Sequence, residues 1–280
     1  MSTQAYEVNN FKNIFGIARI NFEVEAKSPI LIKGADDELS EKNLARFLRL
    51  KKASGETACV IPGSTMKGFM RGTLERLEPA LSSIKEIAMD RFGYVNENKR
   101  TRKDNASTIF FDDFEAIDPE FELRPMIKID PATMSVEHIF TLECIREGTI
   151  FKGGMTIRNW DFKSFGYIKT VIDLANAELI SMGSNKSRGF GHLQFKNPKI
   201  TLNIFGSPAS NPHIKFDGKT IKIIIDFDEK TKKRIIDTEL QLPTAAKIDT
   251  SDPILTKITI EGKEAEEVLE KCKKSIANNS

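Results

Sequence analysis

The amino-acid sequence predicts an α+β protein with a ferredoxin-like, RRM-like palm, whose elements follow the order β-α-β-β-α-β. Two stretches carry apolar residues at helical spacing, and they alternate along the chain with stretches in which every second residue is apolar. The chain has 280 residues, of which 40% are hydrophobic and 29% charged, enough for one large domain or two small ones. We expect the palm with its long insertions over residues 1–199, and an extension of short strands and a final helix over 200–280.

The first strand is expected at 17–26, because apolar residues at alternate positions line one face there. Residues 28–38 combine a short apolar strand with a Gly-Asp-Asp turn. The basic stretch 41–52 fits a helix as well as an extended loop, and the sequence leaves both open.

The first helix is expected to begin at Ser64, because Pro, Gly and this candidate N-cap precede an apolar stripe. Lys67 and Arg71 lie four residues apart beside the stripe, one turn from the helix start. Gly68 and Gly72 each cost up to ~1 kcal/mol relative to alanine, which indicates a close approach to the backbone there. The stripe consists of Met66, Phe69, Met70, Thr73, Leu74 and Leu77.

The later elements also follow from periodicity. A glycine-rich loop at 183–191 leads directly into the last strand of the palm, and 263–277 is expected to be the final helix. Before that loop we expect, in order, a basic aperiodic loop (94–107), a strand (107–117), a hairpin excursion (about 124–148), a strand (148–159) and a helix (162–179).

Composition excludes several classes of protein. Cys59, Cys144 and Cys272 are far apart and no CxxC occurs, so neither a disulfide framework nor a zinc finger is expected, and a cytoplasmic location fits. No run approaches the ~20 apolar residues of a membrane span, and the N-terminus lacks the apolar core of a signal peptide, so no membrane partner is expected. The net charge is only +2, so nucleic-acid binding would depend on local basic clusters.

The glycine-rich loop is the first candidate binding site. Gly183, Gly189 and Gly191 allow sharp turns that point backbone N–H groups outward, and such concave turns bind anions. Lys186 and Arg188 add charge-assisted contacts to phosphate. The alternative is a tight turn between helix and strand that carries solvated cations.

Residues 188–195 also match part of the RNP1 pattern of RRM domains, but they depart from it at His192 and Leu193. A helix precedes this segment and Pro198 follows it, which is the wrong order for that motif. From the partial match we keep one expectation, that Phe190 stacks on a base.

The helix start at Ser64 is the second candidate. Free N–H groups at a helix N-terminus attract phosphate, and Lys67 and Arg71 lie close by. The alternative is an amphipathic helix with a solvated cationic edge. Two acidic pairs, Asp36-Asp37 and Asp112-Asp113, would suit a metal or a general base, or else form polar turns.

The order of these stretches resembles the RAMP superfamily and, within it, the "Cas seven" backbone subunits of type III CRISPR effector complexes (the Csm and Cmr assemblies). The resemblance covers about residues 17–196. Its most specific parts are IPGSTMKGFMRGTLE and GSNKSRGFGHLQF.

The resemblance implies a subunit that binds a CRISPR RNA guide in antiviral defence, with target RNA and other subunits, including further backbone subunits, as partners. It implies that the helix start and the glycine-rich loop hold the guide. It also implies that the hairpin is a thumb whose apolar residues wedge between bases, for which Met134 and Val136 are the candidates. The RNA contacts implied are Ser64, Lys67, Arg71, Gly183, Lys186, Ser187, Arg188 and Gly189.

The resemblance leaves two alternatives for cleavage of target RNA. Family members that cleave carry an Asp about 15 residues before the Pro of IPGS, a position that falls near Phe47 here, and a frequent family His is replaced by Leu31. The nearest carboxylates are Asp36 and Asp37. Cleavage is therefore absent, or uses these two with Mg²⁺ or another divalent metal. Binding alone implies no cofactor.

One other class stays open. A stand-alone RRM-like RNA-processing protein outside any CRISPR complex would share the fold, because a fold does not determine a function.

Overall fold

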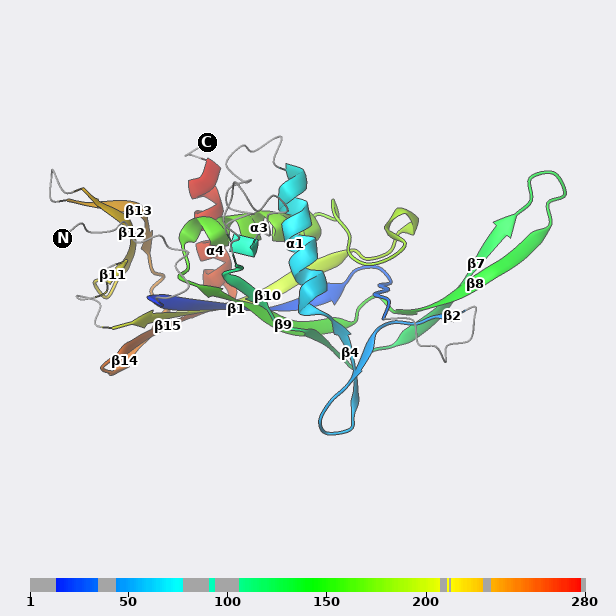
Figure 1. Ribbon diagram of the computed structural model, residues 1–280, viewed down its shortest axis with the longest axis horizontal. Helices are drawn as coiled ribbons and strands as arrows, with labels where there is room; N and C mark the ends of the chain where they lie inside the picture. Colours follow the sequence, from blue (N-terminus) through cyan, green and yellow to red (C-terminus); the bar gives the residue numbers. More distant parts are fainter. Residues whose placement is uncertain are drawn as a thin grey trace, which may run out of the picture.

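The computed structural model describes residues 14–34, 44–77, 91–93, 106–206, 211, 213–228 and 233–277. Its largest sheet has the order β14-β15-β10-β1-β9-β6-β4-β3, and β5 also pairs with β9. Three helices lie on one side of this sheet (Figure 1). The strands are β1 (Gly16–Ala26), β3 (Arg49–Lys51), β4 (Thr57–Ile61), β5 (Ile109–Phe111), β6 (Phe114–Ile117), β9 (Ile150–Arg158), β10 (Leu193–Phe205), β14 (Lys247–Asp252) and β15 (Leu255–Glu261); the helices are α1 (Gly63–Leu77), α3 (Phe162–Asn176) and α4 (Gly262–Ala277).

The chain order β1, α1, β6, β9, α3, β10 is the predicted β-α-β-β-α-β order. β9 lies between β1 and β6, β10 lies on the other side of β1, and all these neighbours are antiparallel. This is the split β-α-β arrangement of ferredoxin-like folds, so the predicted fold class is confirmed.

The predicted periodicities account for the core. In β1, Ile20, Phe22 and Val24 are at most 4% exposed and face the helices, while the alternate positions are polar. The apolar stripe of α1 is buried as expected, except that Leu77 is half-buried. Asp161 caps α3 by accepting a hydrogen bond from the Ser164 N–H at 2.6 Å.

The C-terminal residues join the palm sheet. β10 crosses residue 199, where the sequence suggested a division, β15 pairs with β10, and β14 pairs with β15. α4 packs so closely on α3 that a Cβ atom at Gly166 would lie 2.6 Å from the carbonyl oxygen of Cys272. A smaller sheet is formed by β11 (Ile214–Phe216), β12 (Thr220–Asp228) and β13 (Lys233–Gln241).

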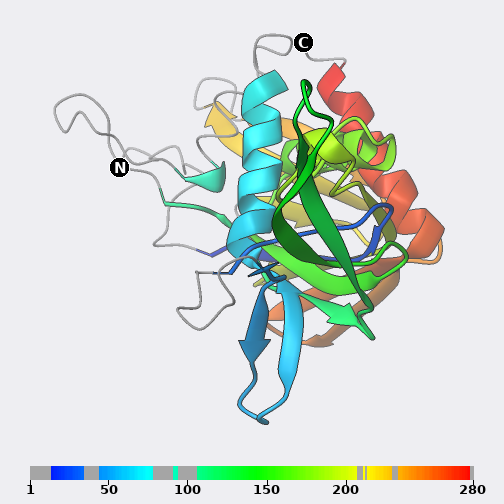
Figure 2. The same cartoon turned by 90° about the vertical axis from the view of Figure 1, so that its right-hand side faces the viewer.

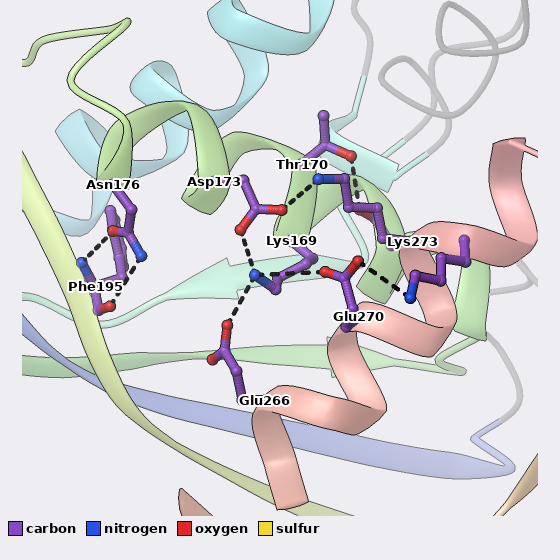
Figure 3. Close-up of polar contacts among 10 residues, drawn as sticks. Lys169, Thr170, Asp173, Asn176, Phe195, Glu266, Glu270 and Lys273 are labelled. Carbon is purple, nitrogen blue, oxygen red and sulfur yellow. Dashed lines mark hydrogen bonds and ion pairs between the residues drawn. The ribbon is translucent and has the colours of Figure 1, made fainter. Parts of the chain in front are cut away.

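A buried lysine joins α3 to α4. Lys169 is 5% exposed and contacts three carboxylates, two of which come from α4 (Figure 3). The carboxylates belong to Asp173, Glu266 and Glu270. The final helix, which was predicted at 263–277, is therefore confirmed and is part of the helical layer.

The predicted hairpin excursion is also confirmed. β7 (Phe121–Ile129) and β8 (Val136–Ile145) project away from the palm in Figure 1, and in Figure 2 this hairpin end of the molecule faces the viewer. β8 also pairs in parallel with the short strand β2 (Leu44–Ala45).

At three places the structure corrects a local prediction or chooses between two alternatives. Residues 44–51 form strand segments, which decides against a helix there. The apolar stretch after Ser28 makes only isolated bridges at Ile30 and Lys33, because each pairs with a different segment. The last palm strand begins at Leu193, since the glycines before it adopt left-handed backbone angles that no strand accepts.

No described helix combines the length and the apolar character that crossing a membrane requires.

Candidate nucleic-acid interface

The start of α1 is held against the turn between β5 and β6. The Gly63 N–H donates to Oδ1 of Asp113 at 2.8 Å. A Cβ atom at Gly63 would lie 2.4 Å from the carbonyl oxygen of Phe111, so only glycine fits. Ser64, expected as the N-cap, lies inside the first turn with an exposed side chain, and Asp113 takes the capping role. One N-terminal donor is thus already bound to a carboxylate, which weakens this helix start as an anion site.

Lys67 lies one turn further along α1 and is half-buried. Its pKa is below the usual value for lysine, first because burial disfavours the charged form and second because the Arg71 guanidinium is near. No carboxylate pairs with Lys67 among the residues that the structure describes. A partly desolvated ammonium beside a second cation is stabilised by any anion that binds there.

Arg71 is engaged within the protein. Its Nε donates to Glu75 Oε1 at 2.6 Å, and its Nη1 donates to the Gly93 carbonyl oxygen at 3.2 Å. The guanidinium therefore ties Gly93 to α1. Its charge is already paired, which makes Arg71 a weaker candidate for an RNA contact than Lys67.

Two glycines of the glycine-rich loop are required for packing. Gly183 has φ +88°, and a Cβ atom there would lie 2.5 Å from the Leu31 carbonyl oxygen. Gly191 has φ +85°, and its Cβ atom would lie 1.9 Å from the Met182 carbonyl oxygen. These glycines let the loop lie directly against the segment that follows β1.

The tip of the loop is different. Lys186–Arg188 form a single 3-10 turn between two left-handed residues, Asn185 (φ 58°) and Gly189 (φ 79°). Lys186, Ser187, Arg188 and Gly189 are all exposed. Arg188 Nη1 donates to Asn185 Oδ1 at 3.1 Å, and neither this guanidinium nor Lys186 pairs with a carboxylate of the described chain. The tip thus presents cations on a tight turn, as an anion site needs.

Phe190 does not serve as predicted. Its side chain is 1% exposed, so the structure leaves no face of the ring for a base. Phe195, the last aromatic residue of the RNP1-like stretch, is 5% exposed and packs edge-on against Phe22. The resemblance to RNP1 fails for a physical reason, because both rings turn into the core beneath the helices.

The sheet face opposite the helices is occupied by ion pairs across the strands. Lys152 lies 3.2 Å from Glu23, and Lys199 lies 2.6 Å from Glu261. Arg19 is paired with Asp112. A face neutralised in this way offers few free cations to a polyanion.

The two predicted binding elements lie on one side of the palm. The Ser184 N–H of the glycine-rich loop donates to the Leu31 carbonyl oxygen at 2.8 Å. The next residue, Ile32, accepts at its carbonyl oxygen a hydrogen bond from the Leu48 N–H, also at 2.8 Å. The Leu48 carbonyl oxygen in turn accepts a hydrogen bond from the Val60 N–H at 3.5 Å. Val60 belongs to β4, the strand that leads into α1. Only two segments therefore separate the glycine-rich loop from β4, and both elements lie toward the hairpin end of the palm (Figure 1).

These two intervening segments carry further cations, of which Arg46 belongs to the basic stretch 41–52 and Lys33 was not expected from the sequence. Lys33 and Arg46 are both exposed. The backbone of Lys33 forms an isolated antiparallel β-bridge with Phe47, the residue that follows Arg46. Neither pairs with a carboxylate within the described ranges. A signal existed for Lys33 in the sequence, since it is the first charged residue after the apolar run Ile30–Ile32.

The hairpin tip carries the two predicted wedge residues. Met134, in the turn with φ 56°, is 72% exposed, and Val136 is 62% exposed. Val136 lies opposite Ile129 in the hairpin, so these two side chains share a face. The exposure fits the expected role and does not test it.

The acidic residues offer no metal site in the described part of the chain, where no group of three His, Cys, Asp or Glu side chains is suitably close. Asp36 and Asp37 lie outside the described residues. Phe47 and Leu31, which the sequence analysis compared with an Asp and a His of the family, are 2% and 0% exposed and belong to the core.

The fold and this surface define an α+β palm of the ferredoxin-like kind, with cations on one side that pair with no carboxylate of the described residues. Residues 23–194 match the RAMP superfamily, and the chain therefore belongs to that superfamily. A chain from the solved structure entitled "Type IV-B CRISPR Complex" is 14% identical with a TM-score of 0.47, over 63% of this chain and 89% of that one. No curated protein matches the sequence.

Proposed function

We propose that this chain is a backbone subunit of a type III CRISPR effector complex and that it binds the guide RNA in antiviral defence. Membership of the RAMP superfamily supports an RNA-binding role, and the two most specific sequence stretches support the narrower assignment. The guide, the target RNA and further copies or relatives of this subunit are the proposed partners, and the cytoplasm is the proposed location.

One observation carries the proposal. Lys33, Arg46, Lys67, Lys186 and Arg188 lie on adjacent segments of one side, without a carboxylate partner in the described chain. Most cations on the open sheet face are paired, so this side is the one that gains most from a polyanion. Each phosphate neutralised on a single strand releases counterions and adds about 0.7 to the log–log salt slope.

A salt titration tests the proposal. The combined variant Lys33→Ala, Arg46→Ala, Lys186→Ala, Arg188→Ala should lower the slope for single-stranded RNA by roughly two to three. A control variant without Lys219 and Lys271, two exposed cations of the C-terminal extension, should leave the slope unchanged. Equal slopes for the wild type and the combined variant would show that the site is elsewhere.

Co-purification separates the alternative class. A complex subunit should elute with guide RNA and neighbouring subunits when they are expressed together. A free monomer without RNA under those conditions would favour a stand-alone RNA-processing protein.

A further inference from the structure

The base of the β7–β8 hairpin is held by the palm on both of its faces. Side chains of neighbouring residues on β7 point to opposite faces. Phe121 and Leu123 therefore share one face, and Glu122, Arg124 and Met126 share the other.

On the first face the contact is made by Arg49 of β3. Its guanidinium lies 4.4 Å from the centroid of the Phe121 ring and 2.6 Å from Glu143 Oε1. Glu143 is paired with Leu123, so the partners of Arg49 lie on the same face. This contact ties the hairpin to the palm sheet.

On the second face the contacts come from the glycine-rich loop. The Arg124 guanidinium lies 5.2 Å from the centroid of the Phe190 ring, and Arg188 Nη1 lies 3.9 Å from Met126 Sδ. Phe190 is fixed by its burial, whereas Arg188 belongs to the exposed tip. A cation over an aromatic face is attracted to the ring. Because the Phe190 ring is buried and cannot move, this attraction fixes the position of the Arg124 guanidinium.

Beyond these contacts the hairpin is exposed along its length. Every residue from Ile127 to Ile139 is exposed. Each strand residue adds about 3.3 Å, so a small rotation at the base becomes a large displacement at the tip. The contacts at the base therefore set the direction of the hairpin.

We propose that Arg124 and Phe190 are positioning residues that fix the hairpin relative to the glycine-rich loop. RNA phosphate bound by Lys186 and Arg188 would then lie at a constant separation from Met134 and Val136. The part that concerns RNA rests on the proposed function, while the direction of the hairpin is a property of the protein alone.

Spin-label distances in the full chain test this without RNA. Ala132→Cys in the hairpin turn and Glu267→Cys on α4 accept labels, because the three native cysteines are buried. Arg124→Gln and Phe190→Leu should each broaden the distance distribution at least twofold relative to the otherwise unchanged labelled chain. Arg124→Lys, which keeps a cation for the ring, should restore the narrow distribution.

Two controls separate this contact from its neighbours. Lys128→Gln removes a cation that lies on the same strand, further from the glycine-rich loop than Arg124, and it should leave the distance distribution narrow. Glu122→Gln breaks the 2.5 Å ion pair to Arg124 while keeping the guanidinium available to the ring, and it should also leave the distribution narrow. Arg124→Gln should not change the midpoint of thermal unfolding, which distinguishes positioning from a general loss of structure. If Phe190→Leu fails to fold, the positioning role is tested by the difference in distance distribution between Arg124→Gln and Arg124→Lys.

An RNA arm separates failure of this proposal from failure of the proposed function. With a single-stranded poly-uridine oligonucleotide, Phe190→Leu should keep the wild-type salt slope, because it changes no charge. A lower slope with an unchanged distribution in Arg124→Gln would make Arg124 an RNA contact and overturn the positioning role. Broadened distributions together with no RNA binding by the wild type would refute the proposed function and leave the positioning role standing.

Discussion

The Nζ atom of Lys169 lies 2.8 Å from Oε1 of Glu266, so a nearly buried ammonium binds the C-terminal helix to the palm. Burial alone would lower the pKa of Lys169, but hydrogen bonds to Asp173 and Glu266 outweigh it and hold the pKa above its usual value. The C-terminal helix is thereby fixed as part of the palm.

We predict that Lys169→Met lowers the free energy of unfolding by about 2 kcal/mol, because it removes the cation that pairs with Glu266 at a helix interface and one of the cations near Asp173 and Glu270. The loss is smaller than the ~3–5 kcal/mol of fully buried pairs, since Glu266 and Glu270 stay partly hydrated. Chemical denaturation measures it. Lys274→Met is the control, because Lys274 lies 4.0 Å from Glu270 and is 74% exposed, and it should cost under about 0.5 kcal/mol. Equal effects of both changes would contradict the role of Lys169.

A second prediction concerns the charge on Lys67. Its pKa in the folded protein is below the usual 10.5, so the unfolded chain holds this proton more tightly. The resulting cost to folding is present below the folded pKa and disappears as the pH rises through 10.5. A phosphate beside the ammonium should raise the pKa again. Titration of the lysine side chain by NMR, with and without single-stranded RNA, should show the upward shift for Lys67. An RNA-bound protein whose Lys67 pKa does not move would exclude Lys67 from the interface.

A third prediction separates two kinds of glycine in the same loop. Gly191→Ala should destabilise the protein by more than about 3 kcal/mol or prevent folding, because its Cβ atom would lie 1.9 Å from the Met182 carbonyl oxygen. Gly189→Ala also introduces a left-handed alanine, but no atom lies within 4 Å of its Cβ position, so the cost should be about 1–2 kcal/mol. Thermal unfolding compares the two. If they are equally destabilising, the packing against Met182 is unimportant.

The palm could be predicted from the sequence because its strands and helices each bury one face. Ile20 and Phe22 repeat at the strand period and Phe165 and Ile168 at the helical one, and all four lie in the core. Local spacing was sufficient for these elements.

The contacts that decide the candidate site come from residues far apart in sequence. Arg71 pairs with Glu75 at a local i,i+4 spacing, but its second contact is the carbonyl oxygen of Gly93, 22 residues further along the chain. Phe190 is buried beneath Arg124, which belongs to the hairpin. No local pattern encodes such contacts, so the sequence identified the basic elements but could not tell which cations are already engaged.

The last prediction concerns cleavage of RNA paired to the guide. Asp112 is paired with Arg19 and Asp113 caps α1, so both carboxylates of that acidic pair have structural partners. The sequence leaves Asp36 and Asp37 as the carboxylates for a divalent metal. The combined change Asp36→Ala, Asp37→Ala should abolish any magnesium-dependent cleavage of the target strand and leave RNA affinity within about twofold of the wild type, because binding depends on cations elsewhere.

Asp112→Asn is the matched control, since it removes one charge from the other acidic pair and should preserve cleavage. Magnesium-dependent cleavage that survives the double change would clear Asp36 and Asp37 of a catalytic role. A wild-type protein that binds guide and target but never cleaves would instead fit the absence of a carboxylate near Phe47, whose side chain is 2% exposed and lies in the core.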